Sequence, residues 1–384
     1  MRVLEVRDGG FGLLGRVAIA APPGRSATGG VRAVEALDGV DLGALAATMA
    51  RKYAFLPFPK NGAAKAAIVL PPVAPPGERK ERLRAFGRAL AGDVRAGRYR
   101  PWTDIGTTED DLREVYAGAG ARAPVFGNSG VFTAYSVAGA GLAACDALGI
   151  APRGARAVIH GFGNVGRELA TSLSRLGLKV VAIANRAASV AAPEGIDAAA
   201  AVARGDRWIE EGGLRGPREA VFEVPCDVLF ACADARAIDA RAAEAMAARA
   251  VVSGANDPFA AGAEEVLLRR GVLLLPDFVV NSGGILGSFL SSFGLGRERI
   301  ERFEMDAWRG ACGRLIARAR RRGLAPPACA RGDVDPSSQP GWLARKLHGA
   351  FYRLSRVPQP LRQLAGEAAL AWARGALGRR FRER

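Results

Sequence analysis

Short apolar runs alternate with longer helical patterns through the middle of the chain. Between the first two of these runs, residues 165–176 carry apolar side chains at helical spacing. Short apolar runs that are bounded by turn residues and separated by helices are typical of buried strands in a parallel sheet. The pattern therefore predicts a doubly wound α/β domain with strands at 157–160, 179–184, 226–230, 250–252 and 272–275.

The part of the chain before this domain has a different pattern. Residues 1–6 and 15–21 flank a DGG turn and predict a pair of strands. Residues 51–72 combine a strand with a small-residue loop, and Thr107 or Thr108, followed by three acidic residues, marks the start of a helix. We therefore expect a separate N-terminal α/β domain, with further helices at 42–49 and 80–90. An alanine-rich helix at 133–148 leads from it to the α/β domain that follows.

A glycine-rich turn stands between the first strand and the first helix of the α/β domain. It reads G-x-G-x-x-G, a sequence that allows a tight turn, close approach of the backbone to a pyrophosphate, and close packing of helix on strand. The start of the helix also offers free N–H groups and the positive end of its dipole to phosphates. A purely structural turn is the alternative. The pattern predicts dinucleotide binding through Gly161, Phe162, Gly163, Asn164, Val165 and Gly166.

The end of the second strand bears on the choice of cofactor. An acidic side chain at this place would accept hydrogen bonds from the ribose hydroxyls of NAD, whereas an arginine suits the additional phosphate of NADP. The chain has Asn185 and Arg186 here. We therefore predict NADP or NAD as the cofactor, with NADP slightly favoured.

Two residues of the N-terminal domain are candidates for acid–base chemistry. Lys65 stands among glycine, alanine and isoleucine, with no acidic residue nearby in the sequence. Burial among such neighbours disfavours a charged ammonium group and lets a lysine exchange a proton near neutral pH. An exposed loop lysine is the alternative. Asp104, taken by itself, is more typical of a turn or a helix cap than of a catalytic acid.

Composition narrows the class of protein. The 384 residues are 49% hydrophobic and 24% charged, which is ordinary for a globular protein with two cores. The apolar runs are shorter than the roughly 18 residues of a membrane span, so we expect no transmembrane helix. The first residues lack the apolar core of a signal peptide. Five separated cysteines without a C-x-x-C pair indicate a reducing cytoplasm and no metal site.

The net charge of +16 raises the question of a nucleic-acid partner. Most arginines are scattered among alanines, and only residues 318–323 and 379–384 concentrate them. We interpret these segments as solvated helix faces and do not expect the chain to bind nucleic acid.

Five motifs occur in an order that resembles the glutamate, leucine, phenylalanine and valine dehydrogenase family of amino-acid dehydrogenases. They are G-G-V-R at Gly29, a pair of lysines, D-I-G-T at Asp104, G-F-G-N-V-G at Gly161 and P-D-F-V-V-N-S-G-G at Pro276. The resemblance covers about residues 12–300. It implies an N-terminal α/β substrate domain (1–133), a Rossmann dinucleotide-binding domain (134–283) and C-terminal helices (284–384) that return to the first domain. The two domains would face each other across a cleft.

The resemblance also implies roles for residues of the substrate domain. Lys52 matches the lysine that binds the substrate carboxylate, and Lys65 matches the lysine that polarises the reacting carbon and a water. Asp104 matches the aspartate that handles proton transfer, and Gly29 and Gly30 belong to the substrate-binding motif. The chain has only two histidines, so a histidine-based hydride transfer is not expected.

Further residues are implied to hold the cofactor. Thr133 and Asn281 match residues that orient the nicotinamide amide. Ala231 and Asn256, which follow further strands of the predicted sheet, are assigned to the cofactor as well.

The lysine loop departs from the family's pattern. Residues 59–65 have one residue more and fewer glycines than the usual loop, which would displace Lys65. A shift of about 1 Å can cost on the order of a hundredfold in rate, so catalytic competence is the property in question. Lys60 is a weaker candidate for the same role.

Substrate choice follows from one missing cation. Glutamate-specific members have a lysine directly before the Gly-Gly motif, where this chain has Thr28, whereas the serine of the later helix is kept as Ser288. Burying a second carboxylate without that cation would be costly. We therefore expect an apolar or small polar amino acid, with Thr28 and Ser288 near its side chain.

The sequence thus predicts a cytoplasmic, homo-oligomeric NAD(P)-dependent amino-acid dehydrogenase that acts on a small-molecule amino acid or 2-oxo acid and not on glutamate. The alternative hypothesis is a cofactor-binding family member without dehydrogenase activity that serves as a regulatory or interaction protein.

Overall fold

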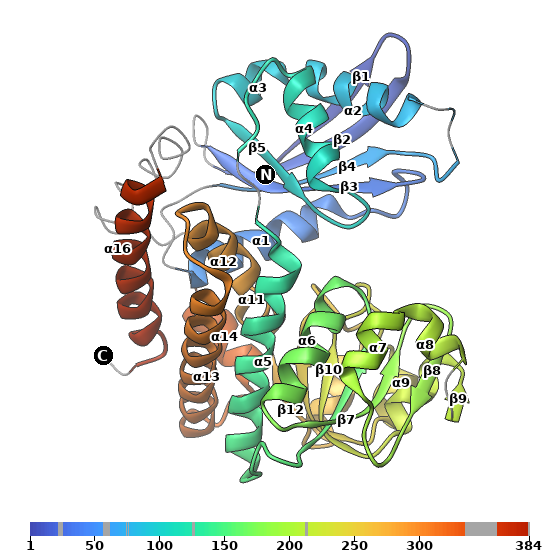
Figure 1. Cartoon of the computed structure of the whole chain (residues 1–384), viewed down its shortest axis with the longest axis vertical. Helices are drawn as coiled ribbons and strands as arrows, with labels where there is room; N and C mark the ends of the chain where they lie inside the picture. The colour runs from blue at the N-terminus through green and yellow to red at the C-terminus, as the bar shows by residue number, and fades with distance from the viewer. Residues whose placement is uncertain are drawn as a thin grey trace. The chain divides into compact units, whose positions relative to one another are not determined.

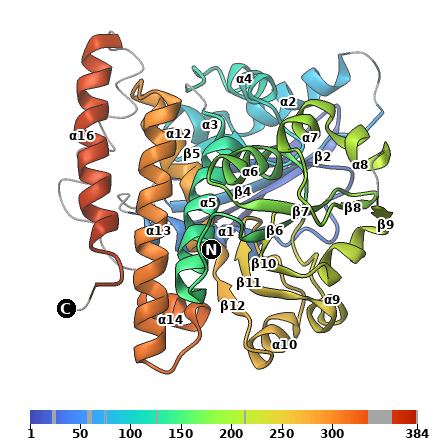
Figure 2. The same ribbon diagram turned by 60° about the horizontal axis from the view of Figure 1, so that its bottom comes forward.

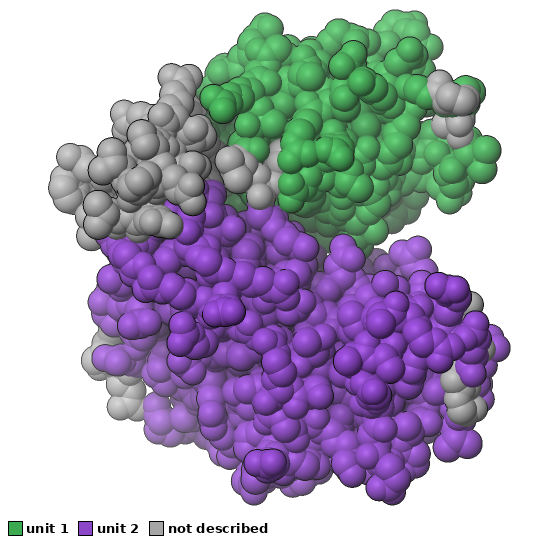
Figure 3. Space-filling view, in the orientation of Figure 1, with its two compact units in different colours: residues 1–126, 335–356 green, residues 127–334, 357–384 purple. Residues whose placement is uncertain are grey.

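The structure, a computed structural model, is drawn in two views in Figures 1 and 2. It describes residues 1–21, 26–56, 62–73, 75, 77–124, 127–211, 214–334 and 359–382. These residues form two compact units, coloured separately in Figure 3. Unit 1 contains the described residues up to 124, and unit 2 contains those from 127 to 334 and from 359 to 382.

Unit 1 is built on a five-stranded mixed sheet. Its strands, in chain order, are Arg2–Asp8 (β1), Gly12–Ala20 (β2), Ala27–Val34 (β3), Gly62–Val69 (β4) and Tyr99–Thr103 (β5). Their spatial order is β1-β2-β4-β3-β5. β1 and β2 form the predicted antiparallel pair, β2 is antiparallel to β4, and β3 runs parallel to both β4 and β5. The sheet therefore places β3 between the strand that carries Lys65 and the strand that leads to Asp104.

Different helices cover the two faces of this sheet, as Figure 1 shows. The helices are α1 (Leu42–Phe55) on one face and α2 (Glu78–Ala89), α3 (Ala91–Arg95) and α4 (Glu109–Gly118) on the other. Ala18 and Ala67 pack against α1, whereas their strand neighbours join the larger core that includes Phe86 and Leu112. Because alternate residues of a strand point to the same face, Lys65 lies on the α1 face with Ala67.

Unit 2 contains the predicted Rossmann sheet. Its strands are β6 (Arg156–His160), β7 (Lys179–Ala184), β8 (Ser189–Ala191), β9 (Leu214–Gly216), β10 (Cys226–Ala231), β11 (Ala248–Ser253) and β12 (Leu273–Leu275). The order is β12-β11-β10-β6-β7-β8-β9, and the five predicted strands are parallel. The three-residue strands β8 and β9 were not predicted because they are too short to show an alternating pattern. The chain order reverses beside β6, the place where such sheets bind ligands.

Helices surround this sheet and extend beyond it. They are α5 (Ser129–Leu148), α6 (Asn164–Arg175), α7 (Ala198–Arg204), α8 (Asp206–Glu211), the 3-10 helix η1 (Arg218–Glu223), α9 (Ala240–Ala245), α10 (Ala263–Arg269), α11 (Asp277–Val280), α12 (Gly283–Ser292), α13 (Arg297–Arg321), α14 (Pro326–Asp333) and α16 (Gln359–Gly378). Figure 2 shows α5 and α13 side by side.

Helix α5 is the central helix of unit 2. It packs against α6, α12, α13 and the sheet, and begins at Ser129, earlier than predicted, because the Asn128 side chain accepts a hydrogen bond from Val131 N. By length and composition α5 is the only helix among the described residues that could cross a membrane, although none was expected from the sequence. It has 72% of its apolar window buried inside the protein, which fits a core helix.

The helices after Gly284 group with unit 2, whereas the sequence interpretation assigned them to the first domain. A Cβ atom on Gly139 would lie 2.4 Å from Met305 O of α13, and one on Gly284 would lie 2.3 Å from Thr133 Oγ1 of α5. The missing side chains let α12 and α13 approach α5 closely. These helices therefore bury their apolar faces against α5.

The arginines at the end of α13 have structural partners. Arg314 donates hydrogen bonds to Leu377 O and Arg380 O at the end of α16, and Arg318 donates one to Arg382 O. Arg318 and Arg322 also pair with Asp333. Carbonyls at the end of a helix lack partners inside the helix, so these arginines cap α16.

Candidate functional site

Lys65 and Asp104 meet in a buried ion pair in unit 1. Lys65 lies in the middle of β4 and its residue exposure is 5%, so the alternative interpretation of an exposed loop lysine is wrong. Its Nζ donates a hydrogen bond to Asp104 Oδ2 at 2.5 Å. The altered loop does not prevent this contact, although residues 57–61, including Lys60, lie outside the described residues.

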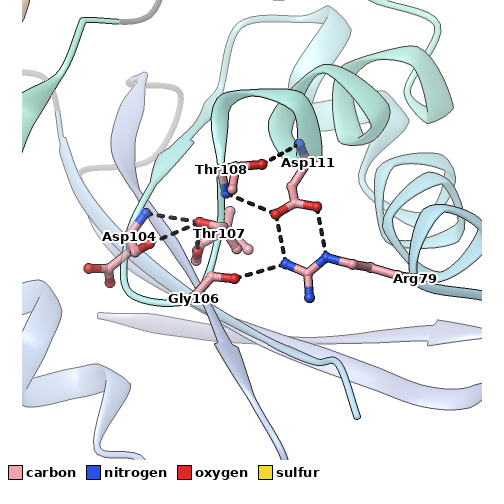
Figure 4. A network of polar contacts seen from close by, with 7 residues as sticks. Arg79, Asp104, Gly106, Thr107, Thr108 and Asp111 are labelled. Atoms are coloured by element: carbon pink, nitrogen blue, oxygen red, sulfur yellow. Dashed lines mark hydrogen bonds and ion pairs between the residues drawn. The ribbon is translucent and has the colours of Figure 1, made fainter. Parts of the chain in front are cut away.

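A network of polar contacts fixes the turn that carries Asp104 (Figure 4). Thr107 Oγ1 donates to Val31 O on β3 at 2.8 Å and accepts from Asp104 N at 3.0 Å. Arg79 donates to Gly106 O and to both carboxylate oxygens of Asp111. The Asp104 carboxylate points away from Arg79, so the network holds the backbone and leaves the carboxylate to Lys65.

Thr108 caps the helix that follows this turn. Its side chain accepts from Asp111 N, and the Asp111 carboxylate accepts from Thr108 N, which forms a capping box at one of the two threonines predicted to start the helix. Asp111 therefore joins the helix start to the Arg79 network.

The glycines of the G-G-V-R motif let the sheet and Asp104 come close. A Cβ atom on Gly29 would lie 1.6 Å from Ala64 O, and one on Gly30 would lie 2.7 Å from Asp104 Cβ. A side chain at Gly30 would thus displace the carboxylate. In this structure the two glycines make room for the Lys65–Asp104 pair.

Thr28 and Lys52 are placed on the same side of the sheet as this pair. Thr28 is two residues before Gly30 on β3, and its buried Oγ1 has no hydrogen-bond partner within the described part of the chain. Lys52 is buried in the last turn of α1, the helix that covers this face of the sheet. Both residues belong to unit 1, as expected for a substrate site.

A third charged residue adjoins the pair and was not singled out in the sequence. Arg32 Nε on β3 lies 3.6 Å from Asp104 Oδ2, the same oxygen that Lys65 contacts. Burial by itself raises the pKa of the Asp104 carboxyl, but the charges of Lys65 and Arg32 outweigh it and hold the pKa below its usual value. Asp104 is therefore a carboxylate between two cations.

The dinucleotide turn of unit 2 has the predicted geometry. Gly161 has φ of 109°, and a Cβ atom on it would lie 2.4 Å from Ala233 N. A Cβ on Gly166 would lie 2.0 Å from Gly161 O, whereas one on Gly163 would meet nothing within 4 Å. The turn is thus tightly packed at Gly161 and Gly166, and it has free space at Gly163, directly before α6. An open helix N-terminus of this kind fits the pyrophosphate of a dinucleotide.

The other residues of the turn have distinct positions. Phe162 is buried, and its carbonyl accepts from Arg167 Nε at 3.0 Å, while the Arg167 guanidinium lies over the Phe162 ring. Asn164 and Val165 are the first two residues of α6. Their N–H groups belong to the free end of the helix.

His160 at the end of β6 is not placed for acid–base chemistry. Burial and the charge of Arg218 lower the pKa of His160 to about 3, so its imidazole is neutral near pH 7. Arg218 Nε donates to His160 Nε2 at 3.3 Å. The residue is a packed neighbour of the dinucleotide turn.

Asn185 and Arg186 follow β7, as predicted, and differ in exposure. Asn185 Oδ1 accepts from Ala187 N and Ala188 N, and Asn185 Nδ2 donates to Asp206 Oδ1 at 3.4 Å. The Arg186 side chain is 80% exposed and lies 3.6 Å from Asp234. Asn185 therefore shapes the turn, and Arg186 remains accessible to an anion.

Asn281 and Asn256 meet at the ends of α11 and β11. Asn281 Nδ2 donates to Asn256 Oδ1 at 3.1 Å and to Ala255 O at 3.0 Å, which leaves the buried Asn281 Oδ1 without a partner among the described residues. Ala231 is buried at the end of β10, and β11 lies between β10 and β12 in the sheet. Asn281 Oδ1 is thus a buried acceptor that a ligand amide could satisfy.

Thr133 and Ser288 use their hydroxyl groups within their own helices. Thr133 Oγ1 donates to Ser129 O, and Ser288 Oγ donates to Gly284 O, each at 2.7 Å. A Cβ on Gly127 would lie 2.9 Å from Ser288 Cα. Ser288 therefore packs against the start of α5 inside unit 2.

The structure thus gathers the candidates into two groups. Lys65, Asp104, Gly29, Gly30, Thr28 and Lys52 lie in unit 1, and the predicted cofactor residues lie with Ser288 in unit 2. Arg32, whose role the sequence interpretation missed, is the last residue of G-G-V-R and has the same strand parity as Thr28 and Gly30. Alternate residues of a strand point to the same face, and this placement of Arg32 beside Thr28 and Gly30 was the sequence signal that could have identified it.

Comparison with known proteins relates part of this chain to a known family. Residues 129–294 match the family model described as Glutamate/Leucine/Phenylalanine/Valine dehydrogenase. Over this segment the chain is similar to that family. A glutamate dehydrogenase of Thermotoga maritima is 37% identical over 159 residues, which are 39% of this chain and 37% of that protein. An NADP-specific glutamate dehydrogenase of Saccharolobus shibatae is 30% identical over 36% of this chain and 33% of that protein.

The chain therefore spans about a third of the length of the curated relatives that it matches. The structural likeness extends further. A hetero-hexameric glutamate dehydrogenase from Thermus thermophilus, in a Leu-bound form, has a TM-score of 0.70 and 28% identity, with 86% of each chain covered. The two-domain α/β fold predicted for this family is thus present in the chain.

Proposed function

We propose that the chain is an NAD(P)-dependent oxidoreductase that converts the CH–NH₂ group of an L-amino acid to a 2-oxo acid and ammonia, or catalyses the reverse reaction. The observation that carries this proposal is the buried Lys65–Asp104 pair in a chain whose other unit has an open dinucleotide turn. Unit 1 would bind the amino acid and unit 2 the cofactor. The family match over residues 129–294 supports the assignment of unit 2.

The chemistry requires proton transfer at two stages. The amino group must lose a proton before hydride leaves the α-carbon, and a water must lose protons as it adds to the resulting imine and ammonia departs. Asp104, held as a carboxylate, can accept these protons, and the Lys65 ammonium can donate to the developing oxygen. When bound, the nicotinamide supplies the hydride acceptor.

The substrate carboxylate needs an anchor of opposite charge. Lys52 is buried on α1, on the side of the sheet that carries Lys65, and we assign it this role. An ammonium group is a point charge that suits a carboxylate. Gly29 and Gly30 keep the neighbouring strand free of side chains that would fill this space.

We propose an apolar or small polar amino acid as substrate, and not glutamate. Thr28 supplies a hydroxyl but no cation for a second carboxylate, and an unpaired buried charge is costly. Ser288, the other residue assigned to the substrate side chain, is likewise uncharged. The structural relative from Thermus thermophilus is described as Leu-bound, which is consistent with an apolar ligand in this fold.

For the cofactor we propose NADP in preference to NAD. The residues that would hold it are Thr133, 161–166, Asn185, Arg186, Ala231, Asn256 and Asn281. No acid directly follows β7, and the exposed Arg186 suits a ribose phosphate. The buried Asn281 Oδ1 can accept from the nicotinamide amide.

We also propose a cytoplasmic homo-oligomer. The five cysteines are free in the structure, which fits a reducing compartment. The Thermus thermophilus relative is described as a hetero-hexamer, which supports an oligomeric assembly for this fold. Sedimentation analysis would test the oligomeric state.

The experiment is a spectrophotometric assay of reduced cofactor. The chain is incubated with each proteinogenic amino acid and NADP or NAD, and with 2-oxo acids, ammonia and reduced cofactor. We expect turnover with at least one apolar or small polar amino acid and little with glutamate. Cofactor binding by calorimetry without turnover in either direction would instead support a cofactor-binding protein that has lost the dehydrogenase reaction.

A further inference from the structure

The Lys65–Asp104 pair can hold its shared proton in two places. With the proton on Lys65 Nζ the pair is an ammonium and a carboxylate, and with the proton on Asp104 Oδ2 it is a neutral amine and a carboxylic acid. Moving the proton changes no other bond and needs no further reactant. Burial favours the neutral form, because both ions lose their hydration. Lys65 and Asp104 are well buried, with side-chain exposures of 6% and 12%.

Arg32 stabilises one of these two forms relative to the other. Its Nε lies 3.6 Å from Asp104 Oδ2, and it has no hydrogen-bond partner within the described part of the chain. A guanidinium remains charged in proteins, so its attraction acts only on the ionised form of Asp104. The Arg32 charge therefore stabilises the ion pair and does not stabilise the neutral pair.

We infer that Arg32 is a positioning residue that determines where this proton resides, keeping Lys65 as an ammonium and Asp104 as a carboxylate. The inference deepens the proposed function, on which it rests for its catalytic consequence. The ammonium is the form that polarises an oxo group, and the carboxylate is the form that accepts a proton. Without Arg32 the pair would shift toward a neutral amine and a carboxylic acid. The amine does not polarise an oxo group as an ammonium does, and the carboxylic acid does not accept a proton.

Among the residues that the structure describes, no other group near Asp104 could replace Arg32. Arg79, on the opposite side of the turn, is engaged by Asp111 and Gly106 O (Figure 4). Tyr99 on β5 is fully buried, and its burial together with neighbouring negative charge raises the pKa of its hydroxyl well above the usual value, so it stays neutral. Among the described residues, the charged groups facing Asp104 are Lys65 and Arg32.

The first test measures the ionisation of Asp104 directly. Protein labelled with ¹³C at aspartate side-chain carbons is titrated by NMR, and D104N assigns the Asp104 signal. In R32Q we expect the Asp104 titration to move to higher pH by about one unit or more, since an opposite charge at this range lowers a carboxyl pKa by about one to three units. R32K, which keeps a charge, should lie closer to the parent protein. An unchanged titration in R32Q would overturn the inference.

Arg16 provides the matched control. It aligns with Ala67 of β4, which aligns in turn with Arg32, so the three residues form one row across the sheet. Arg16 pairs with Glu5 and not with Asp104. R16Q removes an arginine from the same row and should leave the Asp104 titration where it is.

A second variant tests the inference with Arg32 in place, should R32Q fail to fold. In K65M, Arg32 is the cation that remains beside the buried Asp104 among the described residues. We expect it to remain a carboxylate at pH 7 in the ¹³C spectrum, and a protonated Asp104 would overturn the inference.

Kinetics then link the inference to the reaction. In R32Q the acid limb of the plot of kcat against pH should move to higher pH, together with the Asp104 titration. KM for the amino acid should change less than twofold. Absence of turnover in the parent protein would refute the proposed function and leave the NMR result to decide on Arg32. A large KM change with an unmoved profile would show that Arg32 binds substrate instead.

Discussion

Asp104 in unit 1 and Glu304 in unit 2 are both acids with little exposed surface, but their pKa values shift in opposite directions. Asp104 lies beside Lys65 and Arg32, and these cations hold its pKa below the usual value. Glu304 on α13 has no exposed surface and no ion-pair partner in the described part of unit 2. Burial raises its pKa well above the usual value, and the backbone of Gly287 offsets this only partly. Burial beside two cations and burial without them therefore shift the pKa values of the two acids in opposite directions.

The two units use charge differently as a result. Unit 1 brings oppositely charged side chains into its interior, where an acid and a base can exchange protons. Unit 2 offers backbone groups at the start of α6 and keeps cations such as Arg186 at its surface. Glu304, whose pKa is raised by burial between α13 and the glycines of α12, belongs to the packing of unit 2. Removing charge should therefore have its largest effect in unit 1.

The largest effect is expected from Lys65→Met. The substitution removes the ammonium from the buried pair, and loss of an acid–base group lowers rates by about 10²- to 10⁴-fold. We expect kcat to fall by this factor, while the cofactor Kd, measured by fluorescence, stays the same. Lys80→Met, at a lysine that is 55% exposed on α2, is the control. A fall of less than tenfold would remove Lys65 from the proposed mechanism.

The next effect concerns the backbone site of unit 2. Gly163→Ala adds a methyl group where the pyrophosphate would approach, although the protein itself has room for it. We expect the cofactor Kd to rise by about tenfold or more, which corresponds to about 1.4 kcal/mol. Gly296→Ala is matched to it, because Gly296 also precedes a long helix, α13, and also has nothing within 4 Å of a built Cβ. Equal Kd values for the two variants would contradict the assignment of the turn.

Glu304→Gln should change how stability depends on pH. Between the ordinary glutamate pKa of 4.5 and the raised value of Glu304, the folded protein holds a proton that the unfolded chain has released. The free energy of unfolding therefore falls as pH rises, by up to about 1.4 kcal/mol per pH unit for one group. The glutamine variant has no titrating group at this position, so its free energy of unfolding lacks this contribution to the pH dependence.

Urea denaturation of both proteins from pH 5 to 8 measures that difference. His160 and all other groups are present in both proteins, so their contributions cancel when the two curves are subtracted. A difference curve without slope would show that Glu304 is ionised in the folded protein, and the contrast with Asp104 would be lost.

The smallest effect is expected from Arg186→Gln. The side chain is 80% exposed, and its 3.6 Å contact with Asp234 should contribute little to stability. We expect the ratio of NAD to NADP affinity to rise by a few-fold and the melting temperature to stay within about 1 °C, because exposed ion pairs stabilise weakly. Unchanged selectivity would show that Arg186 does not contact the additional phosphate.

The sequence interpretation succeeded where a property is local. The G-x-G-x-x-G turn lies within six residues between a strand and a helix, so spacing alone predicted the strands, the helix and the open glycine of unit 2. The helix start at Thr107 or Thr108 was predicted for the same reason, and Thr108 is the residue that caps the helix. The short strands β8 and β9 and the packing of α12 and α13 on α5 were missed, because pairing and close approach between distant segments leave no local pattern.

By itself the sequence determined the dinucleotide turn, the parallel strands around it and the residue types available for chemistry. Only the tertiary structure decided that Lys65 is a buried strand residue, that Asp104 is its partner 39 residues later, and that Arg32 adjoins the same carboxylate oxygen. The physical reason is that a protonation state depends on charges within a few ångströms. Sheet pairing of β4, β3 and β5 sets those distances, and no single segment encodes them.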